Sequence, residues 1–181
     1  MEEVDARSAA GVVGAMGDEG DLVALRLARG CRCFAISSGG EVASYGWLST
    51  GAEWIGELGL EIAPGAGEAY VWNCLTLPAQ RLRGFFRSLL LLIVEQARRE
   101  GCSRLWIGSA EEGLDAAILS AGFVPVLRIR LSQRPGGRVL AVSAAEGADP
   151  ELVATARAAL GGAGRPISWL SAMPHPEGRR H

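Results

Sequence analysis

The sequence predicts a mixed α/β fold with a mostly antiparallel sheet. Residues 31–77 contain several β-prone runs separated by Gly, Ser and Pro turns. From residue 69 onward, runs typical of strands alternate with helical patterns in the order β-α-β-α-β-β. At 181 residues, the chain is long enough for one hydrophobic core. We therefore expect a single domain over residues 1–164, with its core at 21–143 and a mobile tail at 165–181.

The first half of the chain is expected to supply one helix and then strands. DLVALRLARG, residues 21–30, has apolar positions at helical spacing and ends at a glycine. RCFAISSGGEVASYGWLST, from Arg32, is typical of two strands joined by a Ser-Ser-Gly-Gly hairpin. EWIGELGLEI, residues 53–62, alternates acidic with apolar residues and predicts one further strand.

The second half is expected to alternate strands and helices. Its predicted elements are a strand at 69–77, a helix from about Gly84 to Arg99, a strand in SRLWIGS, a helix in EEGLDAAILSAGF, and paired strands in VPVLRIRL and GGRVLAVSA. A last helix is predicted at about 149–160, because Asp149 suits an N-cap and Pro150 suits the first helical position.

Charge and hydropathy exclude two classes of partner. The formal net charge is -2, so no overall positive field would attract a nucleic acid. The longest apolar block, residues 89–94, is far shorter than the roughly 20 residues that span a bilayer. Residues 1–10 hold three acids and no apolar signal segment. We expect a cytoplasmic protein with neither a membrane nor a nucleic-acid partner.

Histidine chemistry and metal binding are also excluded. The only histidines, His175 and His181, lie in the polar C-terminal tail, where no positioned base or ligand cluster is expected. The four cysteines are too scattered for a zinc site or a disulfide scaffold. The glycines of residues 11–17 mimic a dinucleotide-binding motif, but the preceding ten residues, which include several charged ones, are not expected to form the buried strand it requires.

The stretch LTLPAQRLRGFFRSLLLLIV, residues 75–94, predicts an anion site. A strand runs into a proline, and the following helix begins near Gly84. The first turn of a helix has backbone N–H groups without intrahelical partners, and the helix dipole adds positive potential. Gly84 permits a positive φ, and Arg81, Arg83 and Arg87 add charge that suits phosphate oxygens. A diphosphate would fill this cradle.

This stretch resembles the acetyl-coenzyme-A-binding segment of the GNAT acyltransferase superfamily. That segment is a strand, often a proline, and then Arg/Gln-x-x-Gly-x-Gly/Ala opening a helix; Arg81 and Gly84 match it. LDAAILSAGF resembles the family's next helix, which ends in Gly-Phe. The resemblance covers residues 31 to about 143 and implies a GNAT-like fold with splayed fourth and fifth strands. It implies acetyl-CoA or another acyl-CoA as co-substrate, with no metal.

The resemblance also implies which residues bind the cofactor. The backbone near Cys74, Leu75 and Thr76 would bond the pantetheine amides. The pyrophosphate would lie against a loop formed by Arg81, Leu82, Arg83, Gly84, Phe85 and Phe86.

Several residues depart from the family pattern. Phe86 stands where a second Gly or Ala is expected and would either crowd the phosphate or point into the core. Glu111 or Glu112 stands where many members carry an asparagine. Ile118 takes the place of the tyrosine that often protonates the leaving thiolate, and isoleucine has no proton to donate.

Catalytic candidates come from the acidic and polar residues of the predicted strands. Glu53, Glu57 and Glu61 would share one face of a strand, which is either solvent-exposed or lines an acceptor cleft; Glu57 is the best base of the three. Glu68 is a second candidate base, and Tyr70 would hydrogen-bond the acceptor; a turn glutamate and a half-buried strand tyrosine are the alternatives.

Asn73 is a polar side chain in a hydrophobic strand, so it is either a site residue or bridges the splayed strands. Three tryptophans, Trp47, Trp54 and Trp72, form core or cleft walls.

The sequence thus predicts an acyltransferase that moves an acetyl or similar group from acyl-CoA to the amine of a small-molecule or peptide acceptor, by direct attack with a carboxylate or water base. The alternative is a degenerate domain that binds acyl-CoA without catalysis. The acceptor and the oligomeric state, a homodimer included, stay open.

Overall fold

The computed structural model describes residues 2–5, 8–56, 58–109, 114–134 and 137–160. Its elements, in chain order, are β1 (Glu2–Val4), α1 (Ala9–Met16), the 3-10 helix η1 (Gly17–Glu19), α2 (Leu22–Ala28), β2 (Arg32–Ser38), β3 (Glu41–Ser49), β4 (Glu53–Ile55), β5 (Leu60–Ile62), β6 (Glu68–Thr76), the 3-10 helix η2 (Pro78–Gln80), α3 (Phe85–Arg99), β7 (Arg104–Ile107), α4 (Leu114–Ser120), β8 (Leu127–Arg134), β9 (Gly137–Ala144) and α5 (Pro150–Ala159).

The central sheet has five strands in the order β1-β2-β3-β6-β7. All neighbours are antiparallel except β6 and β7, which are parallel and connected through α3. The predicted hairpin between β2 and β3 is confirmed, with Gly39 and Gly40 at φ values of 66° and 89°. This is the mixed, mostly antiparallel sheet that the sequence predicts.

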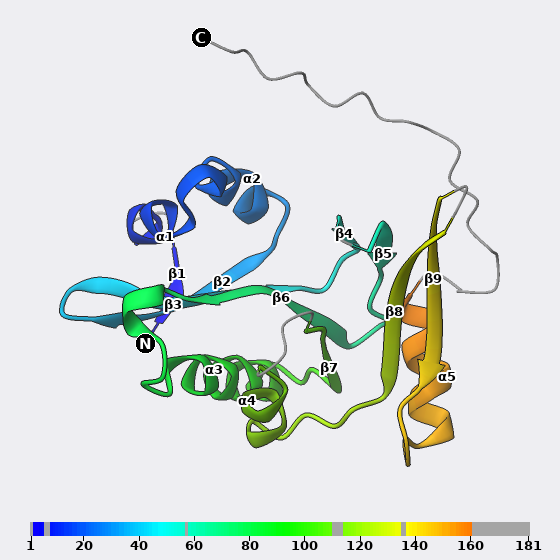
Figure 1. The fold of residues 1–181 in the computed structure, drawn as a ribbon. Coiled ribbons are helices and arrows are strands. Elements are labelled where there is room, and N and C mark those ends of the chain that lie inside the picture. Colours follow the sequence, from blue (N-terminus) through cyan, green and yellow to red (C-terminus); the bar gives the residue numbers. More distant parts are fainter. Residues whose placement is uncertain (1, 6–7, 57, 110–113, 135–136, 161–181) are drawn as a thin grey trace, which may run out of the picture.

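Helices cover both faces of this sheet (Figure 1). On one face, α1 and α2 pack against a buried cluster that includes Val12, Val23 and Trp47. On the other face, α3 and α4 pack against a second cluster, where Leu89 and Ile93 of α3 are fully buried. The apolar block that follows the arginines in the sequence is therefore the inner face of α3.

The N-terminus differs from the sequence prediction. Residues 2–4 form β1, an edge strand antiparallel to β2, and Val4 is buried. The glycine-rich segment that follows is the helix α1, which ends at Gly17 with φ of 56°. The strand β1 was not predicted from the sequence; it is an edge strand whose Glu2 and Glu3 are exposed, and such a strand needs only one inward side chain, here Val4, to be apolar.

Residues 53–62 do not form the single strand that their alternation predicts. They form a hairpin of β4 and β5, in which Glu53 pairs with Ile62 and Trp54 pairs with Glu61. Gly59, with φ of 63°, lies in the connecting turn. Glu53 and Glu61 therefore do not share a face: Glu53 is buried and Glu61 is exposed. Glu57 lies outside the described residues.

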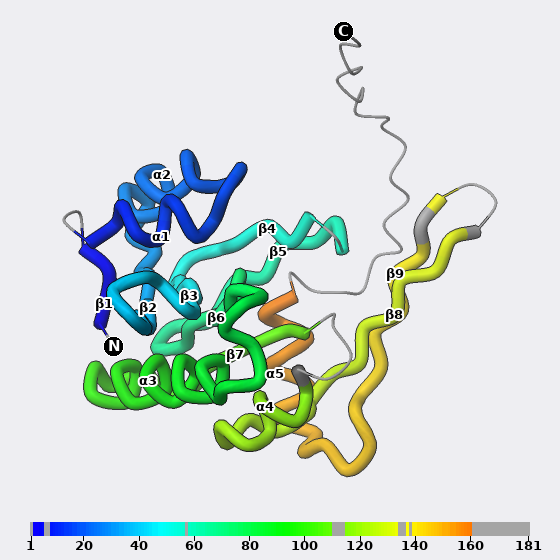
Figure 2. The backbone as a smooth tube through the Cα atoms, turned by 60° about the vertical axis from the view of Figure 1, so that its left-hand side comes forward, coloured from blue at the N-terminus to red at the C-terminus, as the bar shows by residue number. Residues whose placement is uncertain are grey.

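The C-terminal part packs beside the β4–β5 hairpin, where the N–H of Ala63 donates to the Ala159 carbonyl at 2.7 Å. The predicted pairing of β8 with β9 is confirmed, and these strands form a separate two-stranded sheet next to α5 (Figure 2). Asp149 caps α5, since its side chain accepts bonds from the N–H groups of Glu151 and Leu152. The predicted tail at 165–181 lies outside the described residues. Among the helices described, none has the length and apolar character needed to cross a membrane.

Candidate active site

The site begins where β6 and β7 separate. The two strands pair over four positions only, from Glu68 with Arg104 to Val71 with Ile107. β7 ends at Ile107, but β6 continues for five more residues to Thr76. One edge of β6 is therefore open to a ligand beyond Val71. β6 and β7 are the strands predicted at 69–77 and in SRLWIGS, which the resemblance implies to be splayed.

A bulge interrupts β6 at the start of this open edge. The register with β3 shifts between Tyr45, opposite Leu75, and Trp47, opposite Trp72. Asn73 lies within the shift and has a φ of 43°, which is uncommon for a residue other than glycine. Its side chain is exposed, and its Nδ2 donates to Glu19 Oε2 at 3.2 Å. Asn73 thus contacts η1 across the sheet rather than β7, so the predicted bridging of the splayed strands is not what the described residues show.

The loop between β6 and α3 has the shape expected of an anion cradle. Leu82 and Gly84 have φ values of 60° and 78°, and Leu82 is fully exposed. The first intrahelical bond of α3 runs from the N–H of Ser88 to the carbonyl of Gly84 at 3.0 Å. The N–H groups of Phe85, Phe86 and Arg87 therefore precede the hydrogen-bond ladder of the helix. Left-handed backbone next to a free helix N-terminus forms a concave array of N–H donors.

The three arginines of this loop have different surroundings. Arg81 is exposed and its Nε donates to the Thr76 carbonyl at 3.4 Å. Arg83 is exposed, bonds Gln80, and lies over the Phe85 ring with its guanidinium carbon 5.0 Å from the ring centroid. Arg87 donates from Nε to the Ser120 carbonyl at 3.3 Å. Arg87 therefore links α3 to the end of α4, whereas Arg81 and Arg83 stand at the mouth of the cradle.

The residues that depart from the expected motif pack inward. Phe85 and Phe86 are half-buried and contact the core cluster beneath α3, so the Phe86 ring does not fill the cradle. Ile118 of α4 packs against the same cluster. Glu111 and Glu112 lie outside the described residues.

Glu68, at the start of β6, is a structural carboxylate in this arrangement. It is 6% exposed and accepts hydrogen bonds from Trp106 Nε1 at 2.7 Å, from Arg104, and from the Gly65 N–H at 3.2 Å. Burial alone would raise the pKa of this carboxyl, but these bonds and the charge of Arg104 lower it below its ordinary value. A carboxylate held in this way is a weak proton acceptor.

Tyr70 lies two residues along β6 from Glu68 and is buried beside Leu60 and Ile62. Its hydroxyl lies close to Gly108, the residue that follows β7, because a Cβ atom at Gly108 would be 3.7 Å from it. Tyr70 therefore stands at the vertex of the split between β6 and β7. Cys74, on the open edge, is half-buried, and burial of the thiol raises the pKa of Cys74 to about 12.

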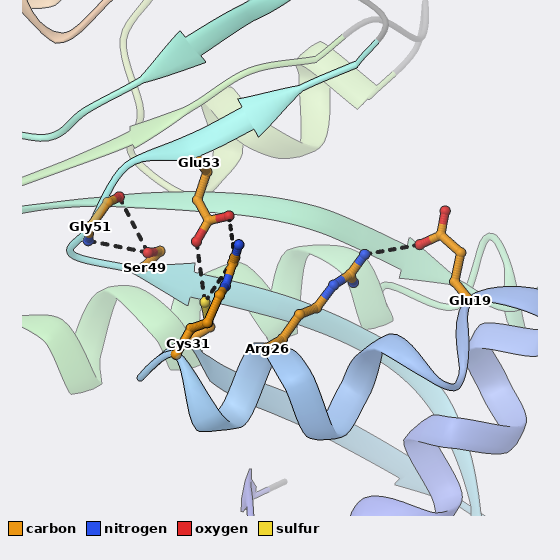
Figure 3. A network of polar contacts seen from close by, with 7 residues as sticks. Glu19, Arg26, Cys31, Ser49, Gly51 and Glu53 are labelled. Atoms are coloured by element: carbon orange, nitrogen blue, oxygen red, sulfur yellow. Dashed lines mark hydrogen bonds and ion pairs between the residues drawn. The ribbon is translucent and has the colours of Figure 1, made fainter. Parts of the chain in front are cut away.

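A pocket of about 190 Å³ lies on the face of the sheet that α2 covers. It is lined by Arg26, Arg29, Glu53 and Trp72, and by the exposed apolar side chains of Leu22, Leu25 and Trp54. Glu53 already accepts two hydrogen bonds within it. Cys31 Sγ donates to Oε1 at 3.1 Å (Figure 3), and Arg29 donates to Oε2 at 2.6 Å. Of the predicted tryptophan walls, Trp54 lines this pocket, Trp47 is core, and Trp72 is shared by both.

Two functional candidates were missed by sequence analysis, namely Glu19 and Arg26. Arg26 of α2 is 7% exposed and pairs with Glu19 of η1 at 3.0 Å (Figure 3). Its guanidinium carbon lies 5.2 Å from the Trp47 ring centroid and 4.6 Å from that of Trp72. Arg26 occupies a polar position on an otherwise amphipathic helix, so the sequence carries no signal that distinguishes it from a solvated arginine.

Comparison with known proteins gives a family match over the same region. A sequence model of the Acetyltransferase (GNAT) family matches residues 13–119, which include the split strands, the cradle and most of α4. No curated protein matches the sequence significantly.

Several solved acetyltransferase structures have a similar fold. The aminoglycoside N-acetyltransferase AAC(6')-Iy in complex with CoA aligns with a TM-score of 0.55 and 13% identity, over 74% of this chain and 98% of that chain. The ribosomal-protein-alanine N-acetyltransferase from Brucella melitensis aligns with a TM-score of 0.55 and 14% identity, over 80% of this chain and 98% of that one. AAC(6')-Iy with the bisubstrate analogue CoA-S-monomethyl-acetylneamine aligns with a TM-score of 0.54 and 14% identity, over 74% and 96% of the two chains. At these identities the likeness concerns the fold.

Proposed function

Since the chain belongs to the GNAT acetyltransferase family, we propose that it transfers an acetyl or similar short acyl group from acyl-CoA to an amine acceptor. The observation that carries this proposal is the cradle of Leu82 and Gly84 at the N-terminus of α3, placed at the open end of the split between β6 and β7. A diphosphate binds well at such a terminus, and a linear arm attached to it would lie along the open strand edge.

The cradle fits a diphosphate in both shape and charge. Its backbone N–H groups point away from the helix, and no side chain from Phe85 or Phe86 covers them, because both rings pack into the core. Arg81 and Arg83 supply exposed guanidinium groups that match phosphate oxygens. The left-handed conformation of Leu82 is energetically unfavourable for a residue with a Cβ atom, which is typical of ligand-binding loops.

The open edge of β6 fits an amide-containing arm. In a strand, each residue directs its N–H and C=O to one side, and successive residues alternate. The N–H of Leu77 donates to Ala43 of β3 at 2.9 Å, so Leu75 also faces β3. Cys74 and Thr76 then face the open edge, and we infer that their backbone groups bond the pantetheine amides.

The arm can extend along β6 only as far as Val71, where pairing with β7 begins. From Thr76 to Val71 the strand spans about 16 Å. The reactive thioester would therefore lie beside Trp72 and Asn73. The pocket under α2, which is lined by Trp72, would admit the acceptor from the face opposite α3.

Acyl-CoA supplies an activated acyl carbon attached to sulfur. The neutral amine nitrogen forms a bond to this carbon, the carbon–sulfur bond breaks, and the sulfur keeps the bonding electrons and takes up a proton. Glu57, which follows β4 in the sequence, remains our proposed base, acting directly or through water, because Glu68 already accepts hydrogen bonds from Arg104 and Trp106. Tyr70, at the vertex of the split, is proposed to hydrogen-bond the acceptor.

A binding module without turnover is the second candidate function. Two observations favour it. Ile118 packs against the core and has no proton to donate, and the Glu68 carboxylate already accepts hydrogen bonds that make it a weak proton acceptor. Measurement of thiol release from acetyl-CoA in the presence of a panel of amines separates the two functions. Binding of acetyl-CoA without release of free thiol would support the binding module.

The cofactor site itself is tested by thermal denaturation with acetyl-CoA. A ligand that binds only the folded chain raises the melting temperature in proportion to the logarithm of its concentration above Kd. We expect Arg81→Ala to weaken this effect by about tenfold in Kd, since it removes a charge-assisted contact. Arg98→Ala, at the opposite end of α3, is the matched control. If acetyl-CoA leaves the melting temperature of the wild-type protein unchanged, the proposed function is wrong.

A further inference from the structure

The buried guanidinium of Arg26, on α2, is linked through Glu19 to Asn73 in the bulge of β6. We propose that Arg26 is a positioning residue for acyl transfer, which holds Glu19 against Asn73 and thereby fixes the backbone beside which the thioester would lie. The inference rests on the proposed function.

Arg26 is held from several sides. Its guanidinium lies against the indole rings of Trp47 and Trp72, with its carbon 5.2 and 4.6 Å from their centroids. NH1 is 3.9 Å from the Met16 sulfur, and NH2 donates to Glu19 Oε2 at 3.0 Å. Cation–π contacts are strongest when the cation is desolvated, as it is here. Arg26 therefore has a single well-determined position between α2 and the sheet.

Glu19 transmits that position to β6. Among the described residues, its hydrogen bonds go to one oxygen, Oε2, which accepts from Arg26 and from Asn73 Nδ2. The Glu19 side chain is 55% exposed, so without Arg26 it would be free to leave Asn73 for water. Asn73 is the residue of β6 with a positive φ, and loss of its partner removes a bond that stabilises this conformation.

The location of this network favours a functional role over simple packing. Replacing a whole buried ion pair by well-packed apolar side chains of similar volume often costs little stability, so packing alone does not require the pair of Arg26 and Glu19. Arg26 and Trp72 also line the pocket proposed for the acceptor. Arg26 therefore stands between the proposed acceptor pocket and the proposed thioester position, where a shift of the bulge would change the alignment of the two substrates.

The test compares two ligands that occupy different lengths of the site. ADP would occupy only the cradle, whereas acetyl-CoA would also reach the bulge. By isothermal titration, we expect Arg26→Met to weaken acetyl-CoA binding about tenfold and to change ADP affinity by less than about twofold. Arg26→Lys keeps the charge and should restore most of the acetyl-CoA affinity. Glu19→Ala, at an exposed position, removes the oxygen that both Arg26 and Asn73 bond; it should reproduce the Arg26→Met pattern and carries the test if Arg26→Met does not fold.

Arg104→Met is the matched control. Arg104 also combines an ion pair, with Glu68, and a tryptophan contact, 5.5 Å from the Trp106 centroid, but at the closed end of β6. The Arg104→Met substitution should leave the ratio of acetyl-CoA affinity to ADP affinity unchanged. Equal acetyl-CoA affinities for wild type and Arg26→Met, or a parallel loss for both ligands, would overturn the positioning role alone. Absence of acetyl-CoA binding by the wild-type protein would overturn the proposed function as well.

Discussion

Replacing Glu68 with glutamine distinguishes a structural carboxylate from a catalytic base. Glu68 is 6% exposed and accepts bonds from Arg104, Trp106 and the Gly65 N–H. Glutamine keeps the shape, but it loses the charge and presents an NH₂ group to donors. The loss of two charge-assisted bonds, reduced because the Arg104 side chain is 34% exposed, should lower the free energy of unfolding by about 2–3 kcal/mol. In a chain of this size, the melting temperature should fall by about 5–10 °C.

The pH dependence gives an independent check on this prediction. The pKa of Glu68 is lowered in the folded state, so its stabilising contribution is present above the unfolded carboxyl pKa, about 4.3, and is lost as the pH falls through the folded value. The difference between wild type and Glu68→Gln should therefore be full at pH 7 and should shrink in acid. Urea denaturation at pH 7 and near pH 3 measures both differences, and Glu61→Gln, at an exposed position of β5, is the control. Unchanged stability together with a large loss of turnover would show that Glu68 is the base and would refute this reasoning.

Three further predictions concern the cradle, α5 and the thiols. Gly84→Ala places a Cβ atom at a φ of 78°, which should cost about 1–2 kcal/mol and weaken ADP binding by isothermal titration; unchanged affinity would separate the cradle from the proposed diphosphate site. Asp149→Ala removes the cap of α5 and should lower the free energy of unfolding by about 1 kcal/mol in urea denaturation, whereas Glu151→Ala should have little effect. Cys74, whose pKa burial raises to about 12, should react with iodoacetamide at pH 8 only when the protein unfolds, as followed by mass spectrometry; labelling at the rate of the denatured chain would contradict the burial.

The parts of the site that could be predicted from sequence are those determined locally. Gly84 is the left-handed N-cap of α3, and the apolar block after it faces the core, because a glycine and a helical period act within a few residues. Phe86 illustrates the limit of local reasoning. Whether its ring covered the cradle or the core depended on the packing of α3 against the sheet, which the motif alone does not determine.

The acidic hairpin shows how a local pattern can mislead. Alternation of acidic and apolar residues over 53–62 predicts a strand with Glu53, Glu57 and Glu61 on one face, but two glycines at 56 and 59 turn the chain back on itself. Glycine is a strong local signal for a turn, and it outweighs alternation when an isolated strand would have no neighbour to pair with. Glu53 then becomes the buried partner of Arg29 and Cys31, and it does not share a face with Glu61.

The network of Glu19, Arg26 and Asn73 could not be predicted, because each of its contacts depends on tertiary structure. Arginine is rarely buried, and nothing in α2 indicates that Arg26 lies between two indoles. Those indoles meet only because the bulge in β6 places Trp72 opposite Trp47, and the same bulge directs Asn73 toward η1, 54 residues away in the chain. The residue that makes the bulge is thus also the residue that the network holds. A substitution at Glu19 should for this reason change the backbone conformation at Asn73. An exposed glutamate in a short 3-10 helix thus becomes a determinant of backbone geometry at the proposed site of acyl transfer.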